Sequence, residues 1–162
     1  MANWLMKSEP DAFSIDDLRS APGQTTSWDG VRNYQARNYL RQMKCGDRVF
    51  FYHSSCKEVG IVGLATVVRE AHPDISAFDP DDDHFDPKSR SDEPTWFMVD
   101  IAFERKLEKP VGLAALKANP KLAQFALTRR GNRLSVMPVS AAEWREILKM
   151  AGVREKPGRR KS

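Results

Sequence analysis

The sequence predicts an α+β domain built on a mostly antiparallel, barrel-like sheet with helices at its periphery. Five apolar stretches have the alternation of β-strands, and they do not follow the regular strand–helix–strand order that a parallel sheet requires. Two of these stretches are apolar on both faces, which is typical of strands covered on both sides. Glycines inside one of them offer the bends that a closing barrel needs. A length of 162 residues with 41% apolar residues fits one domain.

The first half of the chain predicts three strands and two helices. Residues 3–8 alternate weakly, as in a strand, and residues 14–20 form a short helix that opens with a capping box. A second helix is expected from about residue 32 to residue 44, because a glycine stop signal follows it. The strongest strand signals are residues 47–54 and 60–68, and both strands are expected to be central in the sheet.

The second half of the chain predicts two more strands and two more helices. Residues 70–94 are rich in proline and acidic residues, so we expect an irregular surface loop there. Residues 95–103 alternate cleanly, which predicts a strand with a core face. A short helix is expected over residues 111–118 and a last strand over residues 134–138. A capping box opens the final helix, over residues 140–152, and a glycine ends it.

The charged residues are segregated along the chain. The net charge is +4, yet residues 69–93 contain nine acidic and only three basic residues. Residues 154–162 contain five basic residues and one acidic residue, and we expect them to form a disordered tail. A basic body with a basic tail suits a polyanion, because clustered Lys and Arg displace counterions from phosphates. The alternative is a solvated terminus beside a surface insertion.

Several function classes are unsupported by the sequence. No apolar run is long enough to span a bilayer, so we expect a cytoplasmic protein. The spacing of Cys45 and Cys56 relative to His53, His72 and His84 does not match a metal site, and we expect both thiols to be reduced. There is no glycine-rich nucleotide motif. We therefore expect no cofactor and no metal, and we expect a monomer.

Residues 27–38 are the most suggestive stretch for ligand binding. Gly30 favours a turn directly after Trp28, and helical spacing resumes beyond it. An indole beside the start of a helix can hold a flat polar ligand, because unpaired backbone N–H groups lie there. Asn33 offers both a donor and an acceptor, and Tyr34 offers a second ring. A purely structural role in the core is the alternative for Trp28. The remaining tryptophans are expected in the core, namely Trp4, Trp96 and Trp144.

Four segments together resemble the EVE domain family. They are WLMKSEP at 4–10, WDGVRNYQARN at 28–38, FYHS at 51–54 and LSVMPV at 134–139. The resemblance implies an EVE domain with a PUA-like β-barrel over residues 1–153. It also implies a non-catalytic nucleic-acid-binding reader that holds a modified base, such as a methylated or oxidised cytosine or a methylated adenine, in DNA or RNA.

Two groups of residues are candidates for such a site. Those expected to form an aromatic and polar pocket for the base are Lys7, Ser8, Trp28, Asn33, Tyr34, His53, Ser54, Ser135 and Met137. Those expected to contact phosphates are Arg32, Arg37, Arg129, Arg130 and Arg133. A flipped base has a π-face that an indole can cover, which makes Trp28 the first choice for a wall of the pocket.

Two other functions remain open at the level of sequence. One is a hydrolase-like enzyme acting on a nucleoside or a modified nucleic acid. Its acid and base groups would come from Lys7, Glu9, Asp29 and His53. The other is a protein-interaction module. The sequence alone does not choose the base, or between DNA and RNA.

Overall fold

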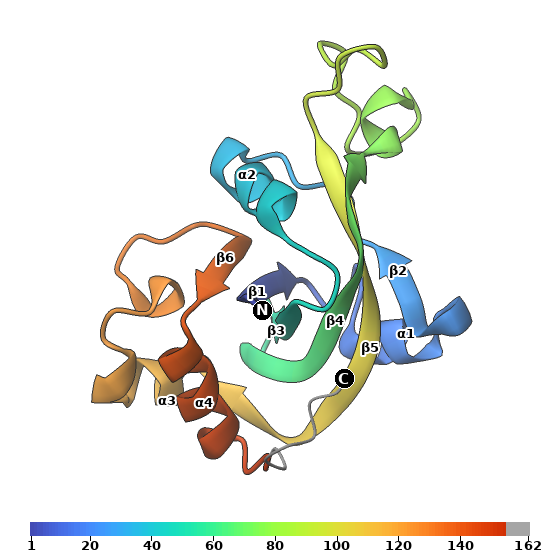
Figure 1. Ribbon diagram of the computed structural model, residues 1–162. Helices are drawn as coiled ribbons and strands as arrows, with labels where there is room; N and C mark the ends of the chain where they lie inside the picture. The colour runs from blue at the N-terminus through green and yellow to red at the C-terminus, as the bar shows by residue number, and fades with distance from the viewer. Residues whose placement is uncertain (155–162) are drawn as a thin grey trace.

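A six-stranded sheet in the order β2-β5-β4-β3-β1-β6 runs through the part of the chain that the computed structural model describes, residues 1–154 (Figure 1). The strands are β1 (Asn3–Ser8), β2 (Thr25–Ser27), β3 (Arg48–His53), β4 (Gly60–Pro73), β5 (Phe97–Gly112) and β6 (Val136–Val139). The α-helices are α1 (Ile15–Ser20), α2 (Tyr34–Gln42), α3 (Leu113–Ala118) and α4 (Ala141–Met150). Short 3-10 turns are η1 (Pro22–Gln24), η2 (Ile75–Phe78), η3 (Pro120–Leu122) and η4 (Ala126–Thr128). Apart from Arg154, the expected tail lies outside the described residues.

The sheet is mostly antiparallel, as predicted, but it is not closed into a barrel. Only β1 and β3 pair in parallel, and every other pairing is antiparallel. The outermost strands, β2 and β6, do not pair with each other. Helix α2 packs against β6 and also against β4 and β5. The prediction of a closed barrel is therefore wrong.

Strands β4 and β5 are longer than predicted and form a twisted ribbon. The strand expected over residues 60–68 continues to Pro73. The strand expected over residues 95–103 begins at Phe97 and continues to Gly112. Charged residues in these extensions do not break the strands, because each strand supplies the backbone partners of the other. Register shifts along the ribbon mark β-bulges, including one beside Gly63, where the glycines predicted a bend. The ribbon holds residues 74–96 at its far end (Figure 1).

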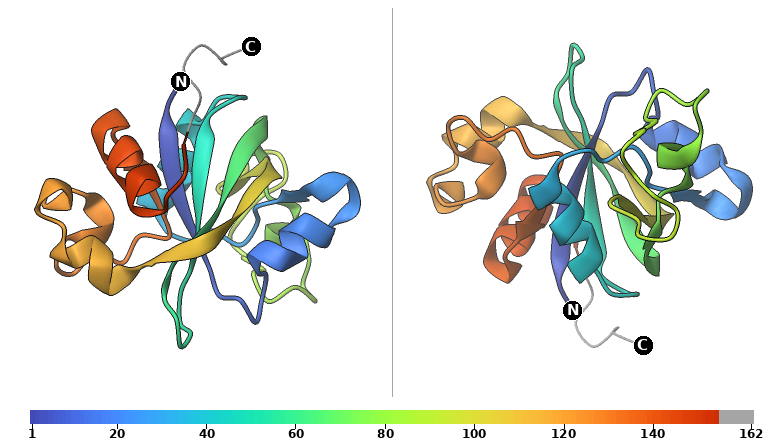
Figure 2. Two further views of the ribbon diagram at one scale, coloured as in Figure 1. Left: turned by 90° about the horizontal axis from the view of Figure 1, so that it is seen from below. Right: turned by 90° about the horizontal axis from the view of Figure 1, so that it is seen from above.

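The core has two parts, one on each face of the sheet. Helices α1 and α2 lie on one face, and α3 and α4 lie on the other (Figure 2). Strand β3 contributes to both parts, because Val49 and Phe51 point toward α1 and α2 while Phe50 and Tyr52 point toward α3 and α4. The central position and two apolar faces predicted for this strand are confirmed.

The three tryptophans expected in the core are all buried. Trp4, Trp96 and Trp144 are 4%, 6% and 3% exposed. The Trp144 ring stacks on Phe50 with the centroids 3.8 Å apart, and the Trp4 Nε1 donates a hydrogen bond to Asp47 at 3.0 Å. Both predicted capping boxes are present, at the starts of α1 and α4. None of the helices in the described residues is long and apolar enough to cross a membrane.

We predict that Phe50→Ala lowers the free energy of unfolding by about 3–5 kcal/mol, because it removes a fully buried ring and leaves a cavity beside Trp144. Urea unfolding followed by circular dichroism measures this change. Phe85→Ala is the matched control, because Phe85 is 38% exposed and its loss is expected to stay within about 0.5 kcal/mol. Equal effects of the two substitutions would contradict the assignment of Phe50 to the core.

Candidate functional site

A cavity of about 490 Å³ opens beside the turn that follows β2. It lies where the end of β1, the loop after β1, strand β2 and the turn at residues 28–32 meet. Its lining residues are Lys7, Ser8, Glu9, Ala12, Phe13, Thr26, Ser27, Trp28, Asp29, Gly30, Val31, Arg32, His84 and Ser135. Five of the residues predicted for the site are among them, namely Lys7, Ser8, Trp28, Arg32 and Ser135.

Trp28 borders the cavity and is also packed into the core behind it. The residue is 8% exposed, and its backbone N–H donates to the Val99 carbonyl at 2.7 Å. Its ring meets the rings of Phe13 and Phe51 nearly at right angles, with centroids 6.5 Å and 5.4 Å away. Perpendicular contacts of this kind hold an aromatic ring in one orientation. The indole is thus held in one orientation: Trp28 belongs to the core, and it also lines the cavity.

Gly30 brings residues 74–96 into contact with the same turn. Its φ angle is +80°, which favours glycine, and a Cβ at this position would lie 2.7 Å from the His84 ring. The His84 ring therefore rests directly on the turn and lines the cavity. Its Nδ1 lies 3.3 Å from an Asp82 carboxylate oxygen. Sequence reasoning missed His84, because it treated the whole acidic segment as a loop without contacts.

A buried carboxylate fixes this arrangement. Asp74 is fully buried and accepts hydrogen bonds from the Gly30 N–H at 2.8 Å, Arg32 Nη1 at 3.0 Å and the Ser76 N–H and Oγ at 2.9 and 2.6 Å. Arg32 also donates to the His84 carbonyl from Nε and Nη2. Burial by itself raises the pKa of Asp74, but the hydrogen bonds from Ser76, Gly30 and Arg32 outweigh it and hold that pKa below its usual range.

These contacts correct the expectation of an irregular surface loop over residues 70–94. Strand β4 extends to Pro73, and the 3-10 turn η2 follows it. Asp74, Ser76 and Ala77 are buried. Arg32, predicted to contact phosphate, forms an ion pair with Asp74, whose carboxylate has no exposed surface.

Asp29 is a second carboxylate at the cavity. Partial burial raises its pKa, and the nearby negative charge of Asp74 acts in the same direction, while His84 opposes the shift. The sequence offered Asp29 only as an acid or base of the hydrolase alternative. In the structure it stands next to Trp28 with an acceptor group available to a ligand.

Lys7 and Ser8 line the end of the cavity and contact the protein around it. The Lys7 backbone N–H donates to the Ser135 carbonyl at 2.8 Å, and its Nζ lies 5.8 Å from the ring centroid of Tyr52. Burial lowers the pKa of Lys7. The Ser8 hydroxyl donates to the Phe13 carbonyl at 2.5 Å. The Ser8 hydroxyl is therefore used within the protein, whereas the Lys7 ammonium has no hydrogen-bond acceptor among the described residues.

His53 and Ser54 lie beside the cavity lining and are used to position neighbouring segments. The His53 Nε2 accepts the backbone N–H of Ile15, at the start of α1, at 3.1 Å. Burial lowers the pKa of His53, which is consistent with a neutral ring that accepts this bond. The Ser54 N–H donates to the Ser8 carbonyl at 2.9 Å.

Asn33, Tyr34 and Met137 also lie outside the lining. Asn33 caps α2, and its Oδ1 accepts the Ala36 N–H at 2.9 Å. Tyr34 is 62% exposed and stacks on Trp96. Met137 is fully buried in the part of the core that faces α3 and α4.

The remaining predicted arginines are exposed or bonded to neutral groups. Arg37 donates from Nη1 to the Thr95 carbonyl at 2.9 Å. Arg129, Arg130 and Arg133 are exposed between η4 and β6, apart from the cavity lining. These four arginines therefore lie outside the cavity lining.

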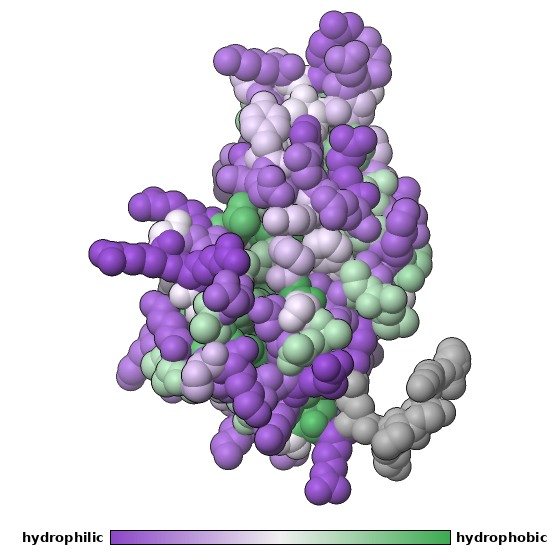
Figure 3. Space-filling model, turned by 60° about the vertical axis from the view of Figure 1, so that its left-hand side comes forward, coloured by the Kyte–Doolittle hydropathy of each residue, from purple (hydrophilic) through white to green (hydrophobic). Residues whose placement is uncertain are grey.

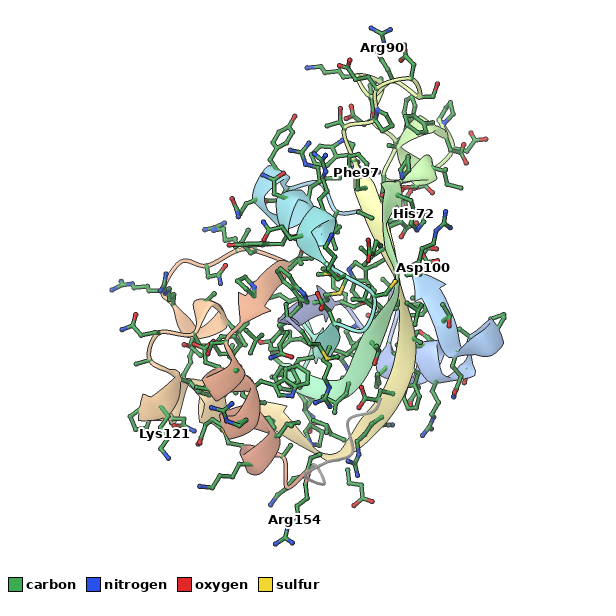
Figure 4. All side chains as sticks on the ribbon, in the orientation of Figure 1. His72, Arg90, Phe97, Asp100, Lys121 and Arg154 are labelled. Atoms are coloured by element: carbon green, nitrogen blue, oxygen red, sulfur yellow. The ribbon has the colours of Figure 1, made fainter. Side chains whose placement is uncertain are left out.

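Ser27, which the prediction omitted, ties β2 to the ribbon next to the cavity. Its Oγ donates to Asp100 Oδ1 at 2.7 Å, and the same oxygen lies 3.0 Å from His72 Nε2. Figure 4 shows His72 and Asp100 together where the ribbon passes β2. The position of Ser27 directly before Trp28 was the signal that could have identified it. Within residues 1–154, no group of three or more His, Cys, Asp or Glu side chains is placed to hold a metal ion.

Comparisons with known proteins agree on one family. The family model described as EVE domain matches residues 2–150. Thymocyte nuclear protein 1 of Homo sapiens is 45% identical over 92% of this chain and 73% of that protein. A crystal structure of human thymocyte nuclear protein 1 in complex with DNA containing 5-methylcytosine superimposes with a TM-score of 0.90 at 44% identity, covering 97% of this chain and 100% of that one.

Two further solved structures extend the comparison. A Pseudomonas syringae protein is 50% identical with a TM-score of 0.90, covering 93% of this chain and 99% of that one. The YTH domain of a Zygosaccharomyces rouxii protein, solved with N6-methyladenosine RNA, has a TM-score of 0.54 over 95% of this chain and 89% of that one. At 12% identity, this last likeness is one of fold.

We predict that Asp74→Asn destabilises the protein by about 3–5 kcal/mol at pH 7, because an amide cannot accept from all the donors that converge on the carboxylate. Because the pKa of Asp74 is lowered on folding, its contribution is complete above the usual aspartate pKa and is lost as the pH falls through the lowered value. Urea unfolding at pH 7 and at successively lower pH is the measurement.

The control for this substitution is Asp92→Asn. Asp92 pairs with Arg90 at 2.8 Å on the surface, and its loss is expected to cost less than about 1 kcal/mol. A difference between wild type and Asp74→Asn that stayed constant down to the lowest pH would show that Asp74 carries no charge-dependent stability.

Proposed function

The chain belongs to the EVE domain family, and from this premise we propose that it is a non-catalytic reader that holds a modified base of DNA or RNA in the cavity beside Trp28. The support from relatives is direct in one respect. Human thymocyte nuclear protein 1 was crystallised with DNA that contains 5-methylcytosine, and that structure superimposes on 97% of this chain. A methylated cytosine is accordingly the first base to test.

The observation that carries this proposal is the fixed indole at the wall of a cavity of suitable size. A volume of about 490 Å³ lies in the usual range for small-molecule pockets. Phe13 and Phe51 hold the Trp28 ring from behind, so a ligand does not have to order it on binding. Stacking of a base on such a ring contributes about 1–3 kcal/mol. A base turned out of its strand meets these requirements.

The polar lining suits the edge of an amino-bearing base. Asp29 and Glu9 provide carboxylate acceptors, and the exocyclic amino group of cytosine or adenine is the matching donor. Asp29 is exposed beside the cavity, so its carboxylate is accessible to such a donor. Apolar surface for an added methyl group is available from Phe13 and Val31.

The remaining predicted residues take supporting roles in this proposal. Lys7, Ser8 and Ser135 shape the end of the cavity, and Arg32 holds its rim through Asp74. Phosphates of the bound strand would then lie over basic surface outside the cavity. Candidates for these contacts are Arg37, Arg129, Arg130 and Arg133, none of which has a carboxylate partner within the described residues.

The geometry gives the hydrolase alternative little support. Lys7, Glu9 and Asp29 line the cavity, but His53 does not. The Lys7 ammonium is directed at Tyr52, and the His53 Nε2 already accepts a backbone N–H. The proposed reader binds the modified base and leaves it chemically unchanged.

We predict that Trp28→Leu weakens binding of a short strand containing 5-methylcytosine roughly tenfold or more, because Leu fills space but offers no π-face for stacking. Trp28 is part of the core, so the variant is also expected to lose stability. Binding is therefore measured by calorimetric titration at a temperature where circular dichroism shows the variant to be folded.

Trp4→Leu is the matched control. Trp4 belongs to the same part of the core and is also buried, but it does not line the cavity. We expect it to lose stability and to keep its affinity. Unchanged affinity of Trp28→Leu for the modified strand would remove Trp28 from the binding site, and release of an altered base during the titration would refute a reader without catalysis.

A further inference from the structure

Four side chains form a continuous series that leads from the cavity to the surface at the start of α2, and we call it the Tyr34 stack. Arg32 lines the cavity, and its guanidinium carbon lies 5.4 Å from the ring centroid of Trp96. Trp96 stacks on Tyr34, with centroids 4.9 Å apart and planes inclined by 30°. The guanidinium carbon of Arg37 lies 5.1 Å from the Tyr34 centroid. The series thus begins at the rim of the cavity and reaches the surface at Tyr34, with the half-buried Arg37 beside it.

The inner part of the Tyr34 stack is rigid, and its outer part is open. Trp96 is 6% exposed, and its Nε1 donates to Asp86 at 2.7 Å, so its ring is fixed. Tyr34, by contrast, is 62% exposed. An aromatic side chain that rests on a fixed ring and keeps most of its surface in water is well placed to meet another flat group.

The α2 side of the Tyr34 stack is basic, whereas Trp96 on its inner side is bonded to Asp86 of the acidic segment. The sequence of α2, YQARNYLRQ, contains two arginines and no acidic residue. Arg37 donates to the Thr95 carbonyl and to Asn38 Oδ1, which are neutral acceptors, so its charge has no carboxylate partner within the described residues. Figure 3, which brings the side of α2 forward, shows a largely hydrophilic surface there. The positive charge of Arg37 favours an anionic partner. The exposed ring of Tyr34 favours a partner with a flat group that can stack on it.

We propose that Tyr34 and Arg37 form a second binding site, for the nucleotide next to the one held in the cavity. Tyr34 stacks on the neighbouring base, and Arg37, which follows Tyr34 in the series, contacts a backbone phosphate of that neighbouring nucleotide. This inference rests on the proposed function, because it takes the cavity as the site of the modified base. It predicts that a strand binds more tightly than the modified nucleoside alone. It also predicts that the second site accepts any neighbouring base, because every base has a π-face.

The test compares two probes, 5-methyl-2′-deoxycytidine and a five-nucleotide single strand with one central 5-methylcytosine. Each is titrated by calorimetry into the wild type and into Tyr34→Leu. We expect Tyr34→Leu to bind the nucleoside as the wild type does and the strand roughly tenfold more weakly. Tyr34→Phe keeps the ring and is expected to bind the strand like the wild type. Gln35→Ala, an exposed change on the same helix, is the matched control and is expected to alter neither affinity.

The arginine is tested through the salt dependence of strand binding. Arg37→Gln should make the plot of log affinity against log salt concentration shallower by about 0.7, the value for one phosphate contact to a single strand. The nucleoside, which has no phosphate, should show no such change.

The outcomes separate this inference from the function on which it rests. If the wild type binds both probes and Tyr34→Leu binds the strand unchanged, the second site is refuted and the cavity stands. If Tyr34→Leu loses affinity for the nucleoside as well, Tyr34 supports the cavity and is not a separate site. If the wild type binds neither probe, the proposed reading of 5-methylcytosine fails, and the second site fails with it.

Discussion

The buried carboxylate of Asp74 is the constraint on which the candidate site depends. A charge without exposed surface is tolerated only when donors surround it, and here they come from the turn at Gly30, from Arg32 and from Ser76. Because these donors lie on two segments far apart in the sequence, the carboxylate joins residues 74–96 to the turn after Trp28. The His84 ring and the Trp96 ring are placed by the same junction. The Asp74 junction therefore positions both His84, which lines the cavity, and Trp96, on which Tyr34 stacks.

The parts of the fold that follow from local sequence patterns were predicted correctly. The parts that depend on pairing between distant segments were missed. Strand β3 is apolar on both faces, and its alternation already indicated a central strand between two parts of the core. The long ribbon of β4 and β5 has no such signal, since its charged extensions are stabilised only by pairing with each other. The open sheet was missed for a related reason. Whether the edge strands β2 and β6 pair depends on their positions in space, which no local pattern in the sequence indicates.

The candidate site could be located from sequence, but its composition could not. Trp28 was recognisable as an aromatic beside a glycine turn, and the cavity lies there. Met137 was misplaced relative to this cavity, because the alternation of β6 turns it toward α3 and α4. His84 was overlooked because the contact that brings it to Gly30 spans more than fifty residues and follows no periodicity. Contacts of this kind depend on the long-range pair between Arg32 and Asp74.

The central claim is that the modified base lies against the indole of Trp28. Nuclear Overhauser effects between the methyl protons of bound 5-methyl-2′-deoxycytidine and the protein test it most directly, because they report only pairs of protons that are close in space. The account predicts effects to the indole protons of Trp28 and to side chains of the cavity lining such as Phe13 and Val31. Effects confined to residues outside that lining, in a sample where the nucleoside is bound, would contradict it.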